Sequence, residues 1–162
     1  MPQYNPATVT WDQLQVGEEI STLHWFVTPD DIAAAADMFH DDNALYFSKS
    51  FAQGTEWGGI VAPFYFLDAT FRWANFVAAS RRHIGEYTIN AHGILENFLP
   101  IRPGDRLTGT MWVHEKFVKR DKNFLTWRIE VRNEEGELVA RKFWRSYWTG
   151  RPIIYPTKES YR

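Results

Sequence analysis

A short polar segment between two apolar stretches carries the side chains best suited to chemistry. It reads His40-Asp41-Asp42-Asn43-Ala44-Leu45-Tyr46 and contains two carboxylates, an imidazole, an amide and a phenol. Such groups donate and accept protons in enzyme sites. A polar loop held against an apolar helix is where binding and catalytic residues gather. We therefore take residues 40–46 as the candidate site.

A second segment, Trp57-Gly58-Gly59-Ile60-Val61-Ala62-Pro63, leads directly into an aromatic helix candidate. Gly58 and Gly59 allow a backbone to approach a ligand closely, since they lack a Cβ atom. The residues up to Pro63 would then bring backbone N–H groups of the helix to a carbonyl oxygen. A tight turn from loop to helix explains the same residues equally well.

Composition limits the classes of protein. A chain of 162 residues with 44% hydrophobic residues predicts one globular domain, residues 1–162. The net charge of −2 argues against a nucleic-acid surface or a polybasic membrane anchor. The absence of Cys excludes disulfides and thiolate catalysis. No metal-ligand pair, signal core or membrane span is visible, so we expect a cytoplasmic protein without a metal or cofactor.

Aromatic residues are numerous for this length, with eight Trp, twelve Phe and seven Tyr. Large aromatic side chains are enriched in cores and in interfaces. One small domain can hardly bury all of them. We therefore expect either a subunit interface or an acyl-sized pocket.

The elements that position the polar segment begin with a β-rich stretch, Ser21–Val27. Thr28 and Pro29 predict a helix start that runs to near His40, because threonine caps a helix and proline suits its first turn. A second, long helix is predicted from Pro63 to about Arg82. Its apolar positions at helical spacing are Phe64, Leu67, Phe71, Ala74 and Ala78.

The second half of the chain is strand-like. Residues 94–99, 107–117, 125–132 and 138–148 carry β-rich patterns, and the alternation over 125–132 is the clearest. A hairpin turn is predicted at 133–137, where Gly136 permits a positive φ. Residues 1–18 are predicted as an arm and 150–162 as a tail. Strands that follow helices predict an α+β fold, with the sheet on the long helix.

Together with Pro100-Ile101-Arg102-Pro103-Gly104-Asp105-Arg106-Leu107-Thr108, the two segments resemble the MaoC-like dehydratases, or (R)-specific enoyl-CoA hydratases. The resemblance is closest to their N-terminal half, the fungal fatty acid synthase type of dehydratase domain. It spans residues 15–148 and leaves 149–162 as a tail. It implies a single hot-dog domain, in which an antiparallel sheet wraps around the long central helix.

Hydratases of this family carry an Asp-x-Asn-Pro-x-His segment, whose Asp and His interconvert an enoyl thioester and a 3-hydroxyacyl thioester. Asp41 and Asn43 match, Ala44 replaces the proline, and Tyr46 replaces the histidine. The resemblance implies candidate catalytic roles for Asp41, Asn43 and Tyr46, with the adjacent His40 as a substitute base. The implied substrate-binding residues are Gly58, Gly59, Ile60, Val61, Ala62, Pro63, Tyr65 and His92.

Tyr46 leaves several functions open, because a phenol of pKa about 10 is a poor base at neutral pH and cannot simply replace the histidine. The leading hypothesis is the half of a hydratase that binds the acyl chain of acyl-CoA or acyl carrier protein. It would work in a hetero-oligomer with a histidine-bearing MaoC-type subunit. A self-sufficient homodimer using Asp41 with His40, His92 or Tyr46 is the first alternative. A non-catalytic acyl-CoA-binding protein and a thioesterase are the others.

Each candidate residue also has a structural explanation. Asp41 and Asn43 are suited to turning the chain after a helix. His40 complements the dipole at a helix C-terminus, and a histidine such as His92 is most often a hydrogen-bonded structural residue. The aromatic residues of the long helix fit a core, and an acyl tunnel is the second explanation.

Overall fold

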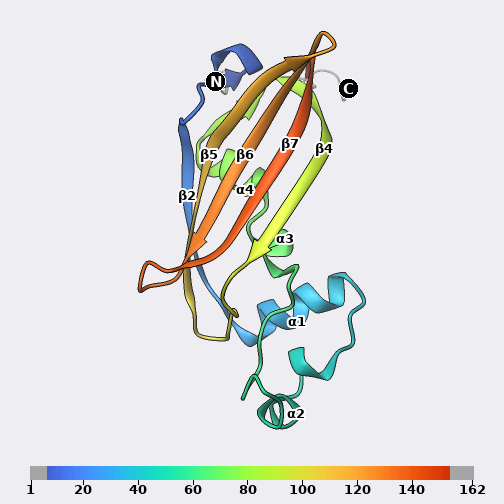
Figure 1. The fold of residues 1–162 in the computed structure, drawn as a ribbon, viewed down its shortest axis with the longest axis vertical. Coiled ribbons are helices and arrows are strands. Elements are labelled where there is room, and N and C mark those ends of the chain that lie inside the picture. Colours follow the sequence, from blue (N-terminus) through green and yellow to red (C-terminus); the bar gives the residue numbers. More distant parts are fainter. Residues whose placement is uncertain (1–6, 154–162) are drawn as a thin grey trace, which may run out of the picture.

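The protein is an antiparallel sheet with helices against one of its faces (Figure 1). The computed structural model describes residues 7–153. The elements are β1 Ala7–Val9, η1 Trp11–Gln13, β2 Glu19–Phe26, α1 Pro29–Met38, η2 Ala44–Tyr46, α2 Lys49–Gln53, α3 Phe66–Thr70, α4 Trp73–Ala79, β3 Arg82–Ile84, β4 Glu86–Asn97, β5 Arg106–Lys119, β6 Lys122–Arg132 and β7 Leu138–Pro152. Five strands pair in the order β2-β5-β6-β7-β4, all antiparallel. The short strands β1 and β3 form a separate parallel pair.

The first helix begins where the sequence predicts. The Thr28 hydroxyl accepts the Asp31 N–H at 3.1 Å, and the Asp31 carboxylate accepts the Thr28 N–H at 2.9 Å. This reciprocal cap fixes the first turn locally, which is why the start is predictable. His40 follows the helix with a positive φ of 53° and turns the chain into the polar segment.

The helix predicted over residues 63–82 is divided into two short helices. Phe71, with ψ 64°, and Arg72, with ψ 140°, leave the helical conformation between α3 and α4. Phe71 and Phe76 are both fully buried, with ring centroids 6.1 Å apart. In a continuous helix they would point about 140° apart, so they could not share a face. The break therefore lets both rings pack against β5.

The site of that packing is Gly109 in β5. A Cβ atom built there would lie 2.5 Å from Phe71 Cε1 and 3.2 Å from Phe76 Cζ, so only glycine leaves room for both rings. The predicted apolar face is consequently only partly right. Leu67 and Phe71 are buried, whereas Phe64, Ala74 and Ala78 are exposed.

The predicted sheet is confirmed, with longer strands. Leu125, Trp127, Ile129 and Val131 in β6 are buried and the residues between them are largely half-buried, as the alternation predicts. The hairpin at 133–137 has Gly136 at φ 79°. The strand predicted from residue 94 starts at Glu86 instead, and the last strand continues to Pro152. Of the predicted arm and tail, residues 1–6 and 154–162 lie outside the described residues.

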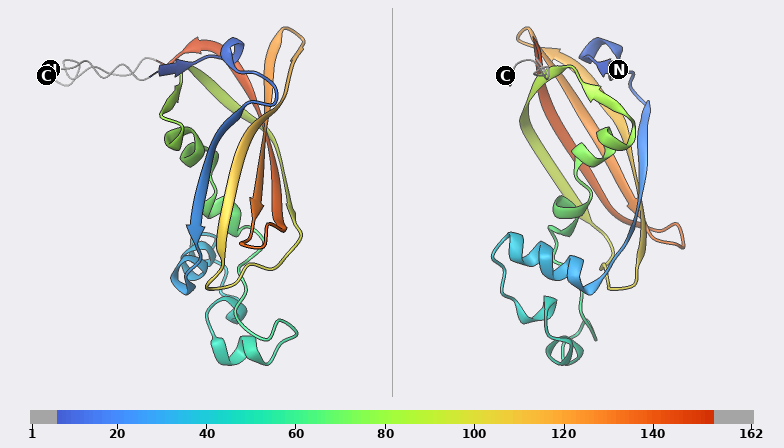
Figure 2. Two further views of the ribbon diagram at one scale, coloured as in Figure 1. Left: turned by 90° about the vertical axis from the view of Figure 1, so that its left-hand side faces the viewer. Right: turned by 180° about the vertical axis from the view of Figure 1, so that it is seen from behind.

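Helices α3 and α4 lie on one face of the sheet, and α1 and α2 lie beyond one end of it (Figure 2). The Ser21 hydroxyl donates to the Phe76 carbonyl at 2.6 Å and ties α4 to β2. Both candidate segments lie at the end of the sheet that carries α1 and α2. Within residues 7–153, none of the helices has the length and hydropathy needed to cross a membrane.

Candidate functional site

The Asp41 carboxylate is held by neighbours on both oxygens. Oδ1 accepts the Asn43 N–H at 3.2 Å, and Oδ2 accepts the Tyr65 hydroxyl at 2.7 Å. The Asn43 side chain in turn accepts the Leu45 N–H at 3.0 Å and caps η2. Asp41 and Asn43 therefore do turn the chain after α1, as their structural explanation predicts. The bond from Tyr65, 24 positions along the chain, is an addition that the local sequence did not predict.

Tyr65 is the buried partner in this pair. It precedes α3, is 8% exposed, and packs against the Phe39 ring (tilted) and the Phe64 ring (edge to face) at centroid distances of 4.4 and 5.0 Å. Burial, the hydrogen bond to Asp41 and the charge on Asp41 all raise the pKa of Tyr65 above its ordinary value. Tyr65 is therefore a neutral hydrogen-bond donor that fixes the Asp41 carboxylate.

Tyr46, which the resemblance places where hydratases carry a histidine, is half-buried in η2. Burial and then the negative charge of Asp41 raise the pKa of Tyr46. A phenol with a raised pKa keeps its proton at neutral pH, so Tyr46 can donate a proton but cannot act as the base. The surroundings of Tyr46 therefore make this phenol an even weaker base than an ordinary tyrosine, and so less like a histidine.

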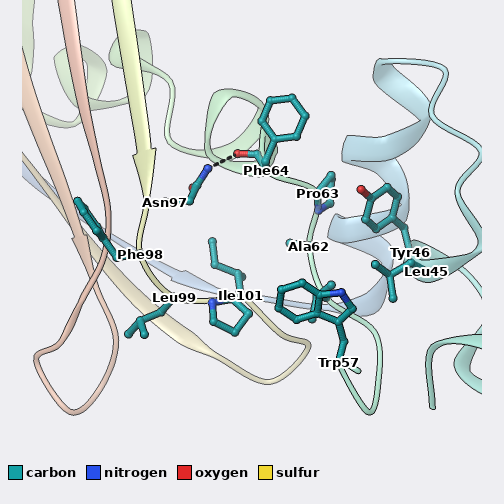
Figure 3. A pocket seen from close by; sticks show the side chains of 12 residues that line it. Leu45, Tyr46, Trp57, Ala62, Pro63, Phe64, Asn97, Phe98, Leu99 and Ile101 are labelled. Carbon is teal, nitrogen blue, oxygen red and sulfur yellow. Dashed lines mark hydrogen bonds between the residues drawn. The ribbon is translucent and has the colours of Figure 1, made fainter. Parts of the chain in front are cut away.

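An apolar pocket of about 480 Å³ lies beside Tyr46. Figure 3 shows Leu45 and Tyr46 on one side, Phe98 and Leu99 on the other, and Trp57 near the segment of Ala62 and Pro63. The Asn97 side chain donates to the Phe64 carbonyl at 2.9 Å and so joins β4 to the start of the helical region. The lining residues are Leu45, Tyr46, Trp57, Val61, Ala62, Pro63, Phe64, Asn97, Phe98, Leu99, Pro100 and Ile101.

The structure brings part of the predicted binding set to this pocket. Val61, Ala62 and Pro63 line it together with Tyr46, whereas Gly58, Gly59 and Ile60 do not. The wall at residues 97–101 was not among the predicted site residues. The signal for it was available, because Phe98-Leu99-Pro100-Ile101 is an apolar run between two strands.

Gly58 and Gly59 lie in a tight turn, the structural alternative to a ligand-binding role. Gly58 has φ 65°, and its N–H donates to the Thr55 carbonyl at 3.1 Å. Arg102 Nη2 donates to the Trp57 carbonyl at 2.8 Å and fastens this turn to the residues before β5. Within residues 7–153, the N–H groups of Ile60 and Val61 donate no hydrogen bond. Since α3 starts only at Phe66, these free donors belong to extended chain and not to a helix N-terminus.

Asp41 lines a smaller depression and is not among the residues that line the apolar pocket. This depression of about 240 Å³ is lined by Asp37, His40, Asp41, Asp42 and Phe47. His40 therefore borders the same space as Asp41, although no hydrogen bond joins them among the described contacts. The candidate acid and the candidate acyl pocket open to different spaces in this chain.

His92 lies on the opposite face of the sheet from the helices. Lys142 in β7 contacts Asp68 of α3, so it points toward the helices. Arg145 is three residues further and points to the other face. His92 is the cross-strand partner of Arg145 and shares its face. The structure therefore does not bring His92 to Asp41 within one chain.

No group of three or more potential His, Cys, Asp or Glu metal ligands occurs within residues 7–153. The polar groups of the candidate site are the Asp41 carboxylate, the two phenols and the His40 imidazole. These groups can accept or donate hydrogen bonds to a polar ligand group. The uncharged pocket beside them has room for an apolar chain.

Comparisons with solved structures give the fold. The R-hydratase PhaJ1 from Pseudomonas aeruginosa has 18% identity and a TM-score of 0.71, with 91% of each chain covered. A MaoC-like dehydratase from Rhodospirillum rubrum has 23% identity and a TM-score of 0.70, covering 88% of this chain and 97% of that one. The HadBC 3R-hydroxyacyl-ACP dehydratase complex from Mycobacterium tuberculosis has 19% identity and a TM-score of 0.65, covering 80% and 98%.

These matches confirm the single hot-dog domain of α+β class that the resemblance implied. No match was found among curated proteins. A profile of the family described as "FAS1-like, dehydratase domain region" matches residues 14–142, which is most of the chain. The protein therefore belongs to the FAS1-like dehydratase domain family.

Proposed function

We propose that this protein is one subunit of an enoyl-thioester hydratase or 3-hydroxyacyl-thioester dehydratase. In this assembly it binds the acyl chain of a cytoplasmic acyl-CoA or acyl carrier protein thioester. A second MaoC-type subunit supplies the catalytic histidine. One observation carries the proposal: the carboxylate of Asp41 is bound by Tyr65 and Asn43 while Tyr46 stands in place of the histidine.

Hydration of an enoyl thioester requires a base that activates water. Tyr46 has a raised pKa and does not serve as that base. Among the described residues, Asp41 has no hydrogen bond to an imidazole, and His40 only lines the same depression. The chain therefore keeps the fold and the Asp41 carboxylate but not an Asp–His acid–base pair. This favours an enzyme in which a second chain supplies the base.

The apolar pocket supports the acyl-binding role. Its volume of about 480 Å³ lies within the usual range for small-molecule sites, and its walls are mostly aliphatic and aromatic. Three large residues on its rim are partly in solvent, with Trp57 41%, Phe98 49% and Phe64 74% exposed. Such exposure suits a surface completed by an acyl chain or by a partner subunit.

A two-chain enzyme is also the arrangement of one structural relative. The HadBC dehydratase is described as a complex and as acting on 3R-hydroxyacyl-ACP. By analogy, we expect a hetero-oligomer in preference to a homodimer.

The test is hydration of two enoyl-CoA substrates, a four-carbon and a ten-carbon acyl chain, by the protein alone and with a histidine-bearing MaoC-type subunit. We expect turnover only in the mixture. Asp41→Asn should leave that turnover within about twofold. Turnover by the protein alone that is abolished by Asp41→Asn contradicts the proposal.

The pocket is tested separately with Ala62→Phe. Because Ala62 lines the pocket, the added ring should keep at least about two methylene groups of a long acyl chain out of it, at about 0.8 kcal/mol each. We expect KM for the ten-carbon substrate to rise about tenfold and KM for the four-carbon substrate to stay nearly unchanged. Ala34→Phe, an exposed position on α1, is the matched control. An equal change in KM for the four-carbon and the ten-carbon substrates would show that this pocket does not bind the acyl chain.

A second candidate function is a self-sufficient homodimer, which the shared depression of His40 and Asp41 favours. It predicts activity without a partner that is lost in His40→Ala. Tight binding of enoyl-CoA without turnover, even in the mixture, would instead indicate an acyl-thioester-binding protein.

A further inference from the structure

Lys142 is a buried charge that the proposed hydration chemistry does not use. It lies in the middle of β7 on the helix-bearing face, and its side chain is 8% exposed. Its ammonium group pairs with the Asp68 carboxylate of α3 and lies 4.5 Å from the centroid of the Trp144 ring. The Asp68 side chain is 40% exposed, so Lys142 is the buried member of the pair, and burying a charge rarely adds stability compared with an apolar residue of the same size. A buried, paired charge that also faces a cavity is therefore a candidate binding group.

Lys142 does face a cavity, of about 460 Å³, lined by residues of α3, α4, β4 and β7. Its walls come from segments far apart in the sequence: Phe39, Asp68, Arg72, Ala74, Asn75, Asn90, Lys142 and Trp144. None of these residues lines the apolar pocket beside Tyr46. The two cavities are therefore separate sites.

The polar groups of this cavity are mainly donors with positive charge. The Arg72 guanidinium has no ion-pair or hydrogen-bond partner among the described residues, and Lys142 uses one of its three protons on Asp68. Asn90 accepts the Trp144 indole N–H at 3.1 Å, which leaves its amide N–H₂ group for a ligand. Two cations face a single carboxylate, so the cavity carries an excess positive charge.

The remaining walls are aromatic. Trp144 lines the cavity beside Lys142, and Phe39 lines it from the chain after α1. The Phe39 ring also contacts the Tyr65 ring, with centroids 4.4 Å apart and the planes tilted by 42°. Aromatic walls suit an apolar ligand body, and the cationic donors suit a carboxylate.

We propose that the cavity between α3, α4 and strands β4 and β7 binds a small organic carboxylate, held by Lys142 and Arg72 with its apolar body against Trp144. This inference goes beyond the proposed hydratase role and does not depend on it. Lys142 and Arg72 supply the charge, and Asp68 holds the ammonium group in place and moderates its field.

The experiment is calorimetric titration of the full chain with benzoate, and with benzamide as the neutral probe of the same shape. We expect saturable binding of benzoate with a Kd of about 1 mM and none of benzamide. Lys142→Met keeps the length and apolar character of the side chain and should weaken benzoate binding at least about tenfold. Lys119→Met, an exposed position in β5, is the matched control and should have no effect.

Asp68→Asn separates a binding site from a structural ion pair. If the cavity binds anions, removing its one carboxylate should tighten benzoate binding about fivefold. A purely structural pair predicts no gain. If Lys142→Met does not fold, Arg72→Gln at an exposed position replaces it and should weaken binding severalfold. Absence of saturable benzoate binding up to about 20 mM, equal binding of benzamide, or weaker binding by Asp68→Asn overturns the proposal.

Discussion

The hydrogen bond from Tyr65 to Asp41 is a long-range contact that holds the polar segment in place. Removing it tests whether Tyr65 fixes the Asp41 carboxylate. In Tyr65→Phe the ring remains packed while the 2.7 Å hydrogen bond to the carboxylate is lost. Hydrogen bonds to charged groups contribute about 1.5–3 kcal/mol, and the half-buried Asp41 can recover water. We therefore expect the free energy of unfolding to fall by about 1.5 kcal/mol.

For a chain of 162 residues, this change corresponds to a fall in Tm of about 4 °C. Urea unfolding provides the measurement, because an unchanged m value with a lower midpoint reports a loss of stability alone. Tyr46→Phe is the matched control. Its hydroxyl makes no hydrogen bond within residues 7–153, so it should cost less than about 0.5 kcal/mol.

A double-mutant cycle then assigns the loss to the pair itself. Tyr65→Phe and Asp41→Asn should show a coupling energy of about 1 kcal/mol, since the two groups share one bond. Equal losses in Tyr65→Phe and Tyr46→Phe, or a coupling energy near zero, would refute the view that Tyr65 fixes Asp41.

Two further predictions concern pH and packing. The pKa values of Tyr46 and Tyr65 are raised in the folded state, so their contribution is complete below the ordinary phenol pKa of about 10 and is lost as the pH rises above it. Urea unfolding between about pH 8 and 11 should therefore show a falling free energy of unfolding, with a shallower fall in Tyr65→Phe. Gly109→Ala should destabilise by about 1–3 kcal/mol, because the new Cβ meets the Phe71 ring at 2.5 Å. Gly93→Ala, where the nearest atom is 3.8 Å away, should change the urea midpoint little.

The parts of the fold that were predictable are those fixed by neighbouring residues. The start of α1 depends on a cap between Thr28 and Asp31, and the hairpin depends on Gly136. The divided helix could not be predicted in this way. Its break depends on Gly109, which meets Phe71 across 38 positions of sequence and leaves room for two rings. Helical spacing describes one helix face, whereas the core selected a different set of side chains.

The same division applies to the site. The turn made by Asp41 and Asn43 is local and follows from their side-chain chemistry. The bond from Tyr65 and the wall at residues 97–101 come from distant segments, so the spacing of the polar residues did not contain them. Tyr65 entered the prediction as a substrate-binding residue, and the structure places its hydroxyl on Asp41.

The separation of the two spaces has a consequence for the proposed partner. A hydratase must bring its base to the thioester whose acyl chain fills the pocket. In this chain Asp41 borders one depression while Tyr46 borders the apolar pocket, where its phenol, with a raised pKa, is the titratable side chain among the described lining residues. The histidine of a partner subunit should therefore lie at the pocket rim near Tyr46 and Trp57. A structure of the two-chain complex with its histidine beside Asp41 and away from this rim would contradict the arrangement.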